Sequence, residues 1–196
     1  APRPTPPVSA RPRRLSVTKI EKWIKDPYSI VADAILKLRP LDDIGMAPGG
    51  AERGTFIHKA LEIFVQRYPK ELPADAEEKL LEIGREVFAD ILSYPAVWAF
   101  WWPRFERMAR WFVGFERERR QTYLPRKMEV KGVLRIRAPY APFELSGTAD
   151  RIDISPLKEA SIIDYKTGSV PSDKQVASGI SPQLALEANM LQQGAF

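Results

Sequence analysis

GTADRIDISPLKEASIIDYKTG, residues 147–168, is the stretch that decides the predicted fold. It predicts a hairpin, with one strand over residues 143–154 and a second over residues 161–167. Residues 155–159, Ser-Pro-Leu-Lys-Glu, supply the turn between them. A further strand is expected over residues 126–138, where apolar and charged residues alternate. Together these strands predict one small sheet.

Three charged residues of the hairpin point to a chemistry. Side chains alternate along a strand, so Asp164 and Lys166 share a face of the second strand, while Asp150 lies on the first. Carboxylates supply the hard oxygen ligands that Mg²⁺ and Mn²⁺ prefer. A lysine beside them can orient or deprotonate the attacking water and offset charge on a phosphate. The pattern indicates metal-assisted phosphodiester hydrolysis; the alternative is a surface hairpin with solvated charges.

These motifs resemble a known family. GTADRID followed by IIDYKTG resembles motifs II and III of the PD-(D/E)xK nuclease superfamily, in its RecB-like branch. Three more segments, LSVTKIEKWIKDPYSIVADAILKLRPLDD, ERGTFIHKALEIF and SPQLALEA, resemble in order the C-terminal nuclease domain of AddB subunits of bacterial AddAB-type helicase-nucleases. The resemblance implies an α/β (α+β) fold with a restriction-endonuclease-like core, in which a small mixed sheet is flanked by helices after a helical N-terminal half.

The resemblance also implies an activity and partners. It implies a Mg²⁺-dependent deoxyribonuclease, with Mn²⁺ able to substitute, that acts as an exonuclease during end resection in double-strand break repair. Its substrate would be a single DNA strand from duplex unwound by an AddA-type helicase-nuclease subunit, and in AddB-like subunits this is the 5′-ended strand. The ATP site would lie outside this chain, which contains no G-x-x-x-x-G-K-[ST] motif. Two alternatives remain: a stand-alone RecB-like exonuclease, and a non-catalytic DNA-binding or scaffold domain of the same fold.

The resemblance assigns the centre of the site. Asp150 and Asp164 correspond to metal ligands, together with the main-chain carbonyl at Tyr165, and Lys166 acts on the nucleophile. The segment G-T-x-x-H-x-x-L-E resembles the first motif of the family, in which the helical histidine, here His58, meets the metal. Since a neutral imidazole binds Mn²⁺ well and Mg²⁺ poorly, His58 either binds the metal or positions its water.

Three candidates surround this centre. Glu62 lies one helical turn after His58 and is a candidate partner for it. Arg53 precedes the predicted helix, where free N–H groups would face a phosphate. Glu129 occupies a position where the family commonly has a glutamate near the metal, and an exposed strand glutamate is the alternative.

Two further residues are DNA-binding candidates. Gln183 begins a segment that resembles the Q-x-x-x-Y motif, which lies along the DNA in the family, but Glu187 stands at the tyrosine position. Lys174, in a polar loop expected over residues 169–180, is a candidate contact for a backbone phosphate.

Composition limits the class of protein. A chain of 196 residues suits one compact domain. Its net charge of +5 and pI of about 9.5 suit a polyanionic partner, although such an excess is common elsewhere. The absence of cysteine excludes disulfides, cysteine-ligated zinc and an iron–sulfur cluster, and departs from the four-cysteine cluster of several RecB-like nucleases.

The same features suggest a location. Without cysteine, a long apolar run or a signal-peptide core, the sequence predicts a soluble, cytoplasmic protein with no membrane partner. The resemblance implies that its source is bacterial. Residues 1–14 contain five prolines and are expected to be an extended linker, whose arginines either touch phosphates or belong to a solvated tether. Residues 15–196 are expected to be a single nuclease domain, as a fragment of a larger chain.

Helices are expected before and after the hairpin. Thr18 and Glu21 have capping-box spacing, and Asp26 caps the next helix with Pro27 at its first position. Tyr28 is expected on the buried face of that second helix. Further helices are expected over residues 55–68, 75–93 and 183–192, and another from Pro103 onward.

Three other groups of residues have two interpretations each. Asp42 and Asp43 are either a metal-binding pair or a solvated turn. Trp98, Trp101 and Trp102 either stack on unpaired bases or belong to the core. The arginines of the helix after Pro103 either follow DNA or form a solvated face.

Overall fold

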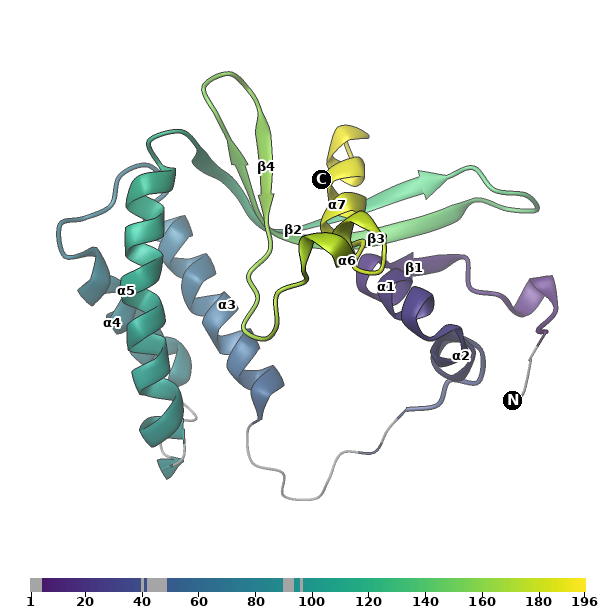
Figure 1. Cartoon of the computed structure of the whole chain (residues 1–196), viewed down its shortest axis with the longest axis horizontal. Coiled ribbons are helices and arrows are strands. Elements are labelled where there is room, and N and C mark those ends of the chain that lie inside the picture. Colours follow the sequence, from purple (N-terminus) through teal and green to yellow (C-terminus); the bar gives the residue numbers. More distant parts are fainter. Residues whose placement is uncertain (1–4, 40, 42–48, 90–93, 96) are drawn as a thin grey trace. The chain divides into compact units, whose positions relative to one another are not determined.

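The computed structural model describes residues 5–39, 41, 49–89, 94–95 and 97–196, without the side chains of Ala51, Val97 and Trp98. The pair Asp42-Asp43 and the Trp98 side chain therefore lie outside the described residues. Figure 1 shows the elements, which are η1 (Val8–Ala10), β1 (Arg14–Ser16), α1 (Val17–Lys25), α2 (Pro27–Ile30), η2 (Val31–Ile35), α3 (Gly50–Arg67), α4 (Ala76–Phe88), η3 (Val97–Trp101), α5 (Trp102–Arg119), β2 (Leu124–Ile136), β3 (Phe143–Ile154), β4 (Ala160–Ile163), α6 (Asp173–Ala177) and α7 (Gln183–Gln192).

The chain divides into two compact units that interleave along the sequence. The first unit comprises residues 1–43, 130–149 and 170–196. The second comprises residues 44–129 and 150–169. Strands β2 and β3 each begin in one unit and end in the other.

The sheet has four strands and is mixed. β1 is parallel to β3, with Leu15 opposite Leu145, and β3 is antiparallel to β4, with Ile152 opposite Ile162. β2 lies beside β3, so the strand order is β1-β3-β2, with β4 also paired to β3. The predicted α/β architecture, a small mixed sheet flanked by helices, is therefore confirmed.

Three helices form the core of the second unit. α3, α4 and α5 lie together (Figure 1), and they bury a cluster of aromatic side chains that includes Phe64, Phe88, Phe105 and Phe112. Trp102 is 5% exposed and belongs to this core, and Trp101 packs against it. Of the two interpretations of these tryptophans, the core placement therefore describes both.

A smaller core holds the first unit. Val17 of α1, Leu145 of β3 and Met190 of α7 are almost fully buried against one another. Ser16, rather than Thr18, caps α1, because the Ser16 hydroxyl accepts a hydrogen bond from the Lys19 N–H at 3.2 Å. The capping-box prediction at Thr18 was wrong by two residues.

The cap of α2 matches the prediction, but the exposure of Tyr28 in that helix does not. The Asp26 carboxylate accepts a hydrogen bond from the Tyr28 N–H at 3.1 Å, and Pro27 opens the helix. Trp23 and Tyr28 are 48% and 50% exposed, so the expected burial of Tyr28 was wrong. Trp23 instead lines a cavity, described below.

Two element boundaries after the predicted hairpin turn also differ from expectation. β4 ends at Ile163, so Asp164 and Lys166 follow the strand instead of lying on one of its faces. The polar segment 169–180 contains the short helix α6, in which Ser172 and Gln175 form a reciprocal capping box. Among the described residues, no helix is both long and apolar enough to cross a membrane.

Candidate metal centre

Three side chains that can bind a metal lie together in the second unit. They are His58 of α3, Glu129 of β2 and Asp150 of β3, and one ligand atom from each lies within 4.8 Å of the others. An open cavity of about 600 Å³ adjoins them, lined in part by His58, Glu62 and Glu129. One imidazole and two carboxylates at this separation fit a single divalent cation such as Mn²⁺.

Asp150 is held in place by two partners. Its Oδ2 accepts a hydrogen bond from the Tyr165 N–H at 2.8 Å, and His58 Nδ1 lies 3.5 Å from the same oxygen. Burial raises the pKa of Asp150; the Tyr165 N–H and His58 oppose this shift, and Asp164 adds to it. A buried carboxylate with a raised pKa gains from a neighbouring cation.

Glu129 combines a raised pKa with an unusual backbone conformation. Burial raises the pKa of Glu129, and the nearby carboxylates of Asp150 and Glu62 raise it further. Its φ of 47° lies in the left-handed region, which a non-glycine residue rarely adopts within a strand. Glu129 therefore lies close to other negative charge, an arrangement that a bound cation would stabilise.

Asp164 and Lys166 form an ion pair beside this cluster. Lys166 Nζ lies 2.6 Å from Asp164 Oδ2, and the Asp164 side chain is 8% exposed. Asp164 acts on the pKa of Asp150, but it is not one of the three residues whose ligand atoms converge. The structure thus brings together His58, Glu129 and Asp150, and holds Asp164 with Lys166 at their edge.

Tyr165 connects these groups to the core. Its ring packs edge-on against His58 and against Phe112, each with a centroid separation of 5.9 Å. Burial raises the pKa of Tyr165 to about 12, so its hydroxyl stays protonated. That hydroxyl accepts a hydrogen bond from Arg151 Nη1 at 3.2 Å. Tyr165 therefore has little freedom to move its peptide away from Asp150.

Arg151, which donates to the Tyr165 hydroxyl, belongs to a buried network of charged side chains. Arg151 is fully buried, and its guanidinium donates hydrogen bonds to the carboxylates of Glu116 on α5 and Asp153 on β3. Arg119 joins it, with its Nε 2.6 Å from Asp153 Oδ2. Sequence reasoning missed Arg151, Glu116 and Asp153, although one signal was available. Glu116 occupies a helical position otherwise reserved for the apolar face of α5. Sequence reasoning expected Arg119, as one of the arginines after Pro103, to follow DNA or form a solvated face, and its 18% exposed side chain paired with Asp153 shows that this was wrong.

The remaining candidates of the second unit take the following positions. Glu62 lines the cavity, accepts hydrogen bonds from Lys59 at 2.7 Å and Gln66 at 3.0 Å, and lies one turn from His58. Arg53 lies inside α3, because the helix begins at Gly50 instead of near Thr55 as predicted. Its N–H donates to Gly49 O at 3.1 Å and is therefore engaged in the helix.

Gln183 and Lys174 belong to the first unit, whereas the whole metal-binding cluster belongs to the second. Gln183 opens α7, and its amide donates a hydrogen bond to Glu187 Oε1 at 3.2 Å. Glu187, at the expected tyrosine position, is 2% exposed. Lys174 is exposed on α6.

Comparisons with known proteins give a family and several relatives. A family model described as the PD-(D/E)XK nuclease superfamily matches residues 14–196. An uncharacterized protein of Rickettsia bellii is 35% identical over 185 residues, which cover 94% of this chain and 22% of the relative. Uncharacterized protein RT0391 of Rickettsia typhi is 34% identical over 189 residues, with the same coverage of each chain. The chain spans about a fifth of the length of the curated relatives it matches.

Proposed function

This chain belongs to the PD-(D/E)XK nuclease superfamily, and from that membership we propose that it is a Mg²⁺-dependent deoxyribonuclease that hydrolyses phosphodiester bonds. Nucleases of this superfamily typically use a divalent metal. The observation that carries the proposal is the convergence of His58, Glu129 and Asp150 within 4.8 Å. Burial raises the pKa of both carboxylates in that cluster, and a bound cation would oppose this shift.

We assign the residues of the second unit separate roles in this reaction. Asp150, Glu129 and His58 would hold the metal, with Asp164 and the Tyr165 carbonyl as further ligands, and Mn²⁺ would substitute for Mg²⁺. The bound ion supplies Lewis acidity and lowers the pKa of a water. Lys166, 2.6 Å from Asp164, offers its ammonium to orient the attacking water and to offset charge on the phosphate.

Other residues keep this arrangement in order. The Tyr165 N–H donates to Asp150 Oδ2 and so orients the carboxylate of that ligand. Glu62, Arg53, Lys174 and Gln183 remain proposed supporting or DNA-contacting residues. Gln183 already donates one amide hydrogen to Glu187 Oε1 at 3.2 Å, which orients its side chain on α7.

We also propose a setting for the reaction. The three sequence segments that resemble AddB, together with the hairpin motifs, support a nuclease module that acts on one strand during helicase-coupled end resection in the bacterial cytoplasm, with an AddA-type subunit as partner. The division into a linker over residues 1–14 and one nuclease domain over residues 15–196 belongs to the same proposal. In this setting the exonuclease would receive single-stranded DNA as duplex is unwound.

The test combines metal binding with cleavage. Mn²⁺ and Mg²⁺ are titrated calorimetrically into the chain, into Asp150→Asn and into Glu71→Gln, and each protein is assayed on a labelled single-stranded oligonucleotide. Glu71 is an exposed acid of the same unit and serves as the control for loss of one carboxylate. We expect binding and cleavage in the parent and in Glu71→Gln, and loss of both in Asp150→Asn.

Two results would count against the proposal in different ways. Metal binding without cleavage by the parent would favour the non-catalytic DNA-binding alternative. Unchanged binding and cleavage in Asp150→Asn would mean that the cluster is not the reaction centre.

A further inference from the structure

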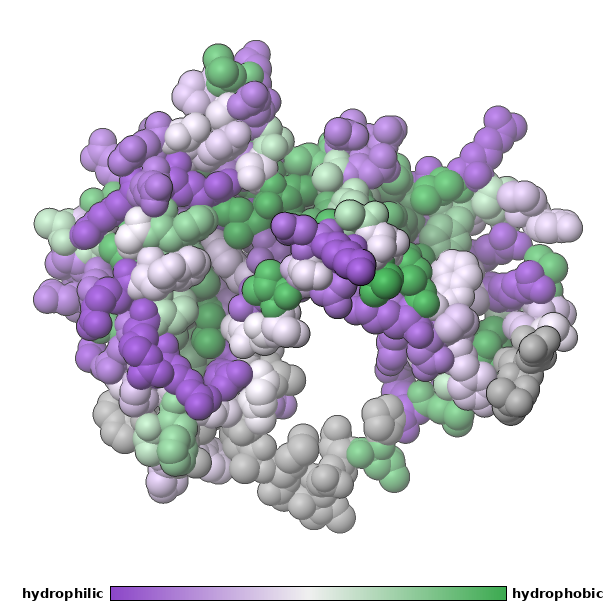
Figure 2. Space-filling view, in the orientation of Figure 1, coloured by the Kyte–Doolittle hydropathy of each residue, from purple (hydrophilic) through white to green (hydrophobic). Residues whose placement is uncertain are grey.

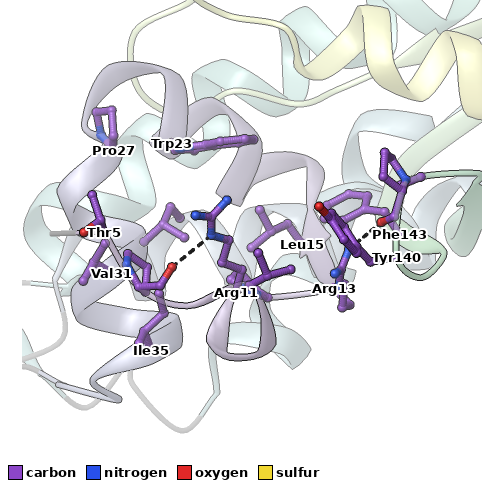
Figure 3. A pocket seen from close by; sticks show the side chains of 16 residues that line it. Thr5, Arg11, Arg13, Leu15, Trp23, Pro27, Val31, Ile35, Tyr140 and Phe143 are labelled. Carbon is purple, nitrogen blue, oxygen red and sulfur yellow. Dashed lines mark hydrogen bonds between the residues drawn. The ribbon is translucent and has the colours of Figure 1, made fainter.

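The first unit contains a second cavity, which none of the proposed nuclease residues lines. Its volume is about 550 Å³, within the range of small-molecule sites. Three segments surround it: residues 5–15, residues 23–35 of the first helices, and residues 138–143 between β2 and β3 (Figure 3). It is therefore built by parts of the chain far apart in sequence.

The walls of this cavity are apolar, with aromatic side chains at the rim. Leu15 and Ile30 are buried, being 4% and 6% exposed, and Phe143 lines the cavity beside them. Trp23 and Tyr140 are 48% and 88% exposed. Large aromatic faces that are open to solvent above an apolar floor suit a flat ring, because stacking on such a face requires no matching hydrogen bonds.

Two arginines line the same cavity. Arg11 donates from Nε to Pro6 O at 3.2 Å, and Arg13 donates from Nη1 to Pro139 O at 3.4 Å (Figure 3). Each guanidinium has five N–H donors, so these single bonds orient the side chains and leave donors for an anion. None of the residues that line the cavity, all of them described, is acidic.

The distribution of charge points to the same unit. The first unit contains thirteen lysines and arginines against eight acidic residues, whereas the second contains seventeen of each. The whole net charge of +5 therefore belongs to the unit that holds this cavity. Such an imbalance attracts a polyanion, and phosphate contacts dominate the affinity of proteins for nucleic acids.

From these observations we propose that the cavity binds a nucleotide of a single-stranded DNA segment, with its base against Trp23 and Tyr140 and the adjoining phosphates at Arg11 and Arg13. The strand must be single, because the bases of a duplex are stacked on one another and cannot offer their faces to a side chain. The inference rests on the proposed nuclease function, to which it adds a holding site for the substrate strand.

The other basic surface with an exposed tryptophan is less suited to this role. Hydrophilic residues cover much of α5 (Figure 2), whose outer face carries Arg104, Arg107 and the 66% exposed Trp111. Its Arg110, however, is paired with Glu77 of α4 at 3.2 Å, and the second unit has no net charge. This face supplies the control for the test below.

The test measures the binding of fluorescein-labelled dT15 by fluorescence anisotropy, with EDTA present so that no strand is cut. Stacking contributes about 1–3 kcal/mol per base, so we expect Trp23→Ala and Tyr140→Ala each to weaken binding at least about fivefold. Trp111→Ala removes an exposed tryptophan from the second unit and should leave the affinity unchanged. Since Tyr140 is 88% exposed, its replacement should leave folding intact.

The arginines are tested through salt. Arg11→Gln and Arg13→Gln should each lower the slope of log K against log[salt] by about 0.7, the value for one lost phosphate contact on a single strand. Arg135→Gln is the matched control, because Arg135 belongs to the same unit, has a side chain 79% exposed and does not line the cavity. A smaller change of slope is expected there.

The outcomes separate this inference from the nuclease proposal. Parent-like binding of dT15 by Trp23→Ala and Tyr140→Ala would overturn the inference, as would loss of binding in Trp111→Ala alone, even if the parent cleaves DNA with Mn²⁺. Conversely, the parent could bind dT15 and cleave no DNA, while Trp23→Ala weakens the binding of dT15. That result would overturn only the nuclease proposal.

Discussion

At the scale of single residues, the centre of the second unit carries a cost that a metal would remove. Glu129 and Asp150 are carboxylates whose pKa values are raised, first by burial and then by neighbouring acids. The unfolded chain releases these protons more readily than the folded one does. The free energy of unfolding therefore falls as the pH rises above the ordinary pKa of either carboxyl group and that group ionises.

This sign leads to a prediction for Glu129→Gln. Without divalent ions the variant should be more stable than the parent at about pH 7, where Glu129 is ionised, and the difference should shrink as pH falls below the ordinary value of 4.5. Urea unfolding in EDTA at about pH 7 and about pH 4 measures it. Glu71→Gln should show no such pH-dependent gain, and an equal gain for Glu129→Gln at both pH values would contradict the explanation.

Arg151 gives a second prediction at this scale. Arg151→Met should lower the free energy of unfolding by about 1–3 kcal/mol, because Glu116 and Asp153 each lose a buried hydrogen-bond donor and keep one arginine partner, Arg120 and Arg119 respectively. Arg135→Met removes an arginine from a surface ion pair and should cost about 1 kcal/mol or less. Denaturant titration of both variants checks this. Similar small losses would mean that water enters the network freely.

At the scale of elements, two helical glycines predict opposite effects of the same substitution. A Cβ on Gly84 of α4 would lie 2.2 Å from the Phe105 ring of α5, whereas a Cβ on Gly114 of α5 meets no atom within 4 Å. Gly84→Ala should therefore destabilise the chain by about 1–3 kcal/mol through overpacking. Gly114→Ala should stabilise it by up to about 1 kcal/mol, since alanine is the better helix former.

Thermal unfolding of the two variants provides the comparison. The melting temperature should fall for Gly84→Ala and rise for Gly114→Ala. If both rise, α4 and α5 are not as closely packed at Phe105 as the structure has them.

The accuracy of sequence reasoning also differs between elements. The sequence over residues 143–154 predicts a strand with the same bounds as β3, because Phe143, Leu145 and Ala149 alternate with polar residues in its first half. The start of α3 is missed because Gly49 and Gly50 are typical of a loop; the Glu52 side chain, which accepts from the Gly49 N–H at 2.8 Å, stabilises the helix there. Local composition alone does not reveal a cap of that kind.

In the candidate site, too, sequence reasoning anticipated some residues and missed others. His58 and Asp150 could be anticipated from their motifs, and the structure brings them together with Glu129. Arg151 and Asp153 could not be. Alternation places them on the face of Leu145 and Ala149, but a charged residue at a buried position requires a partner that the hairpin itself does not supply. For Arg151 that partner is Glu116, which lies 35 residues earlier in the sequence.

At the scale of the whole molecule, the two units should respond to different ligands. With EDTA present, the ionised carboxylates of the metal centre repel phosphates, so dT15 should slow hydrogen exchange in residues 5–39 and 130–149 of the basic unit. Mn²⁺ should instead slow exchange in α3 and around Asp150. Hydrogen exchange with mass spectrometry measures both, with Mg²⁺-free buffer as the reference.

A reversed pattern would be informative. If dT15 without metal protects α3 and leaves residues 5–39 unchanged, the charge distribution between the units does not direct the strand. The distribution itself could not be predicted from sequence, because residues 130–149 and 170–196 are assigned to the basic unit by the fold alone.

The interleaving of the two units has a consequence for inheritance. Each unit is encoded by separate stretches of the gene, and the stretches that encode β2 and β3 each contribute residues to both units. A single crossover or deletion can therefore neither donate nor remove one unit without splitting the other. We expect the basic and the metal-binding halves to have been transmitted through descent as one indivisible cassette, and attempts to graft either half onto another protein to require the whole stretch.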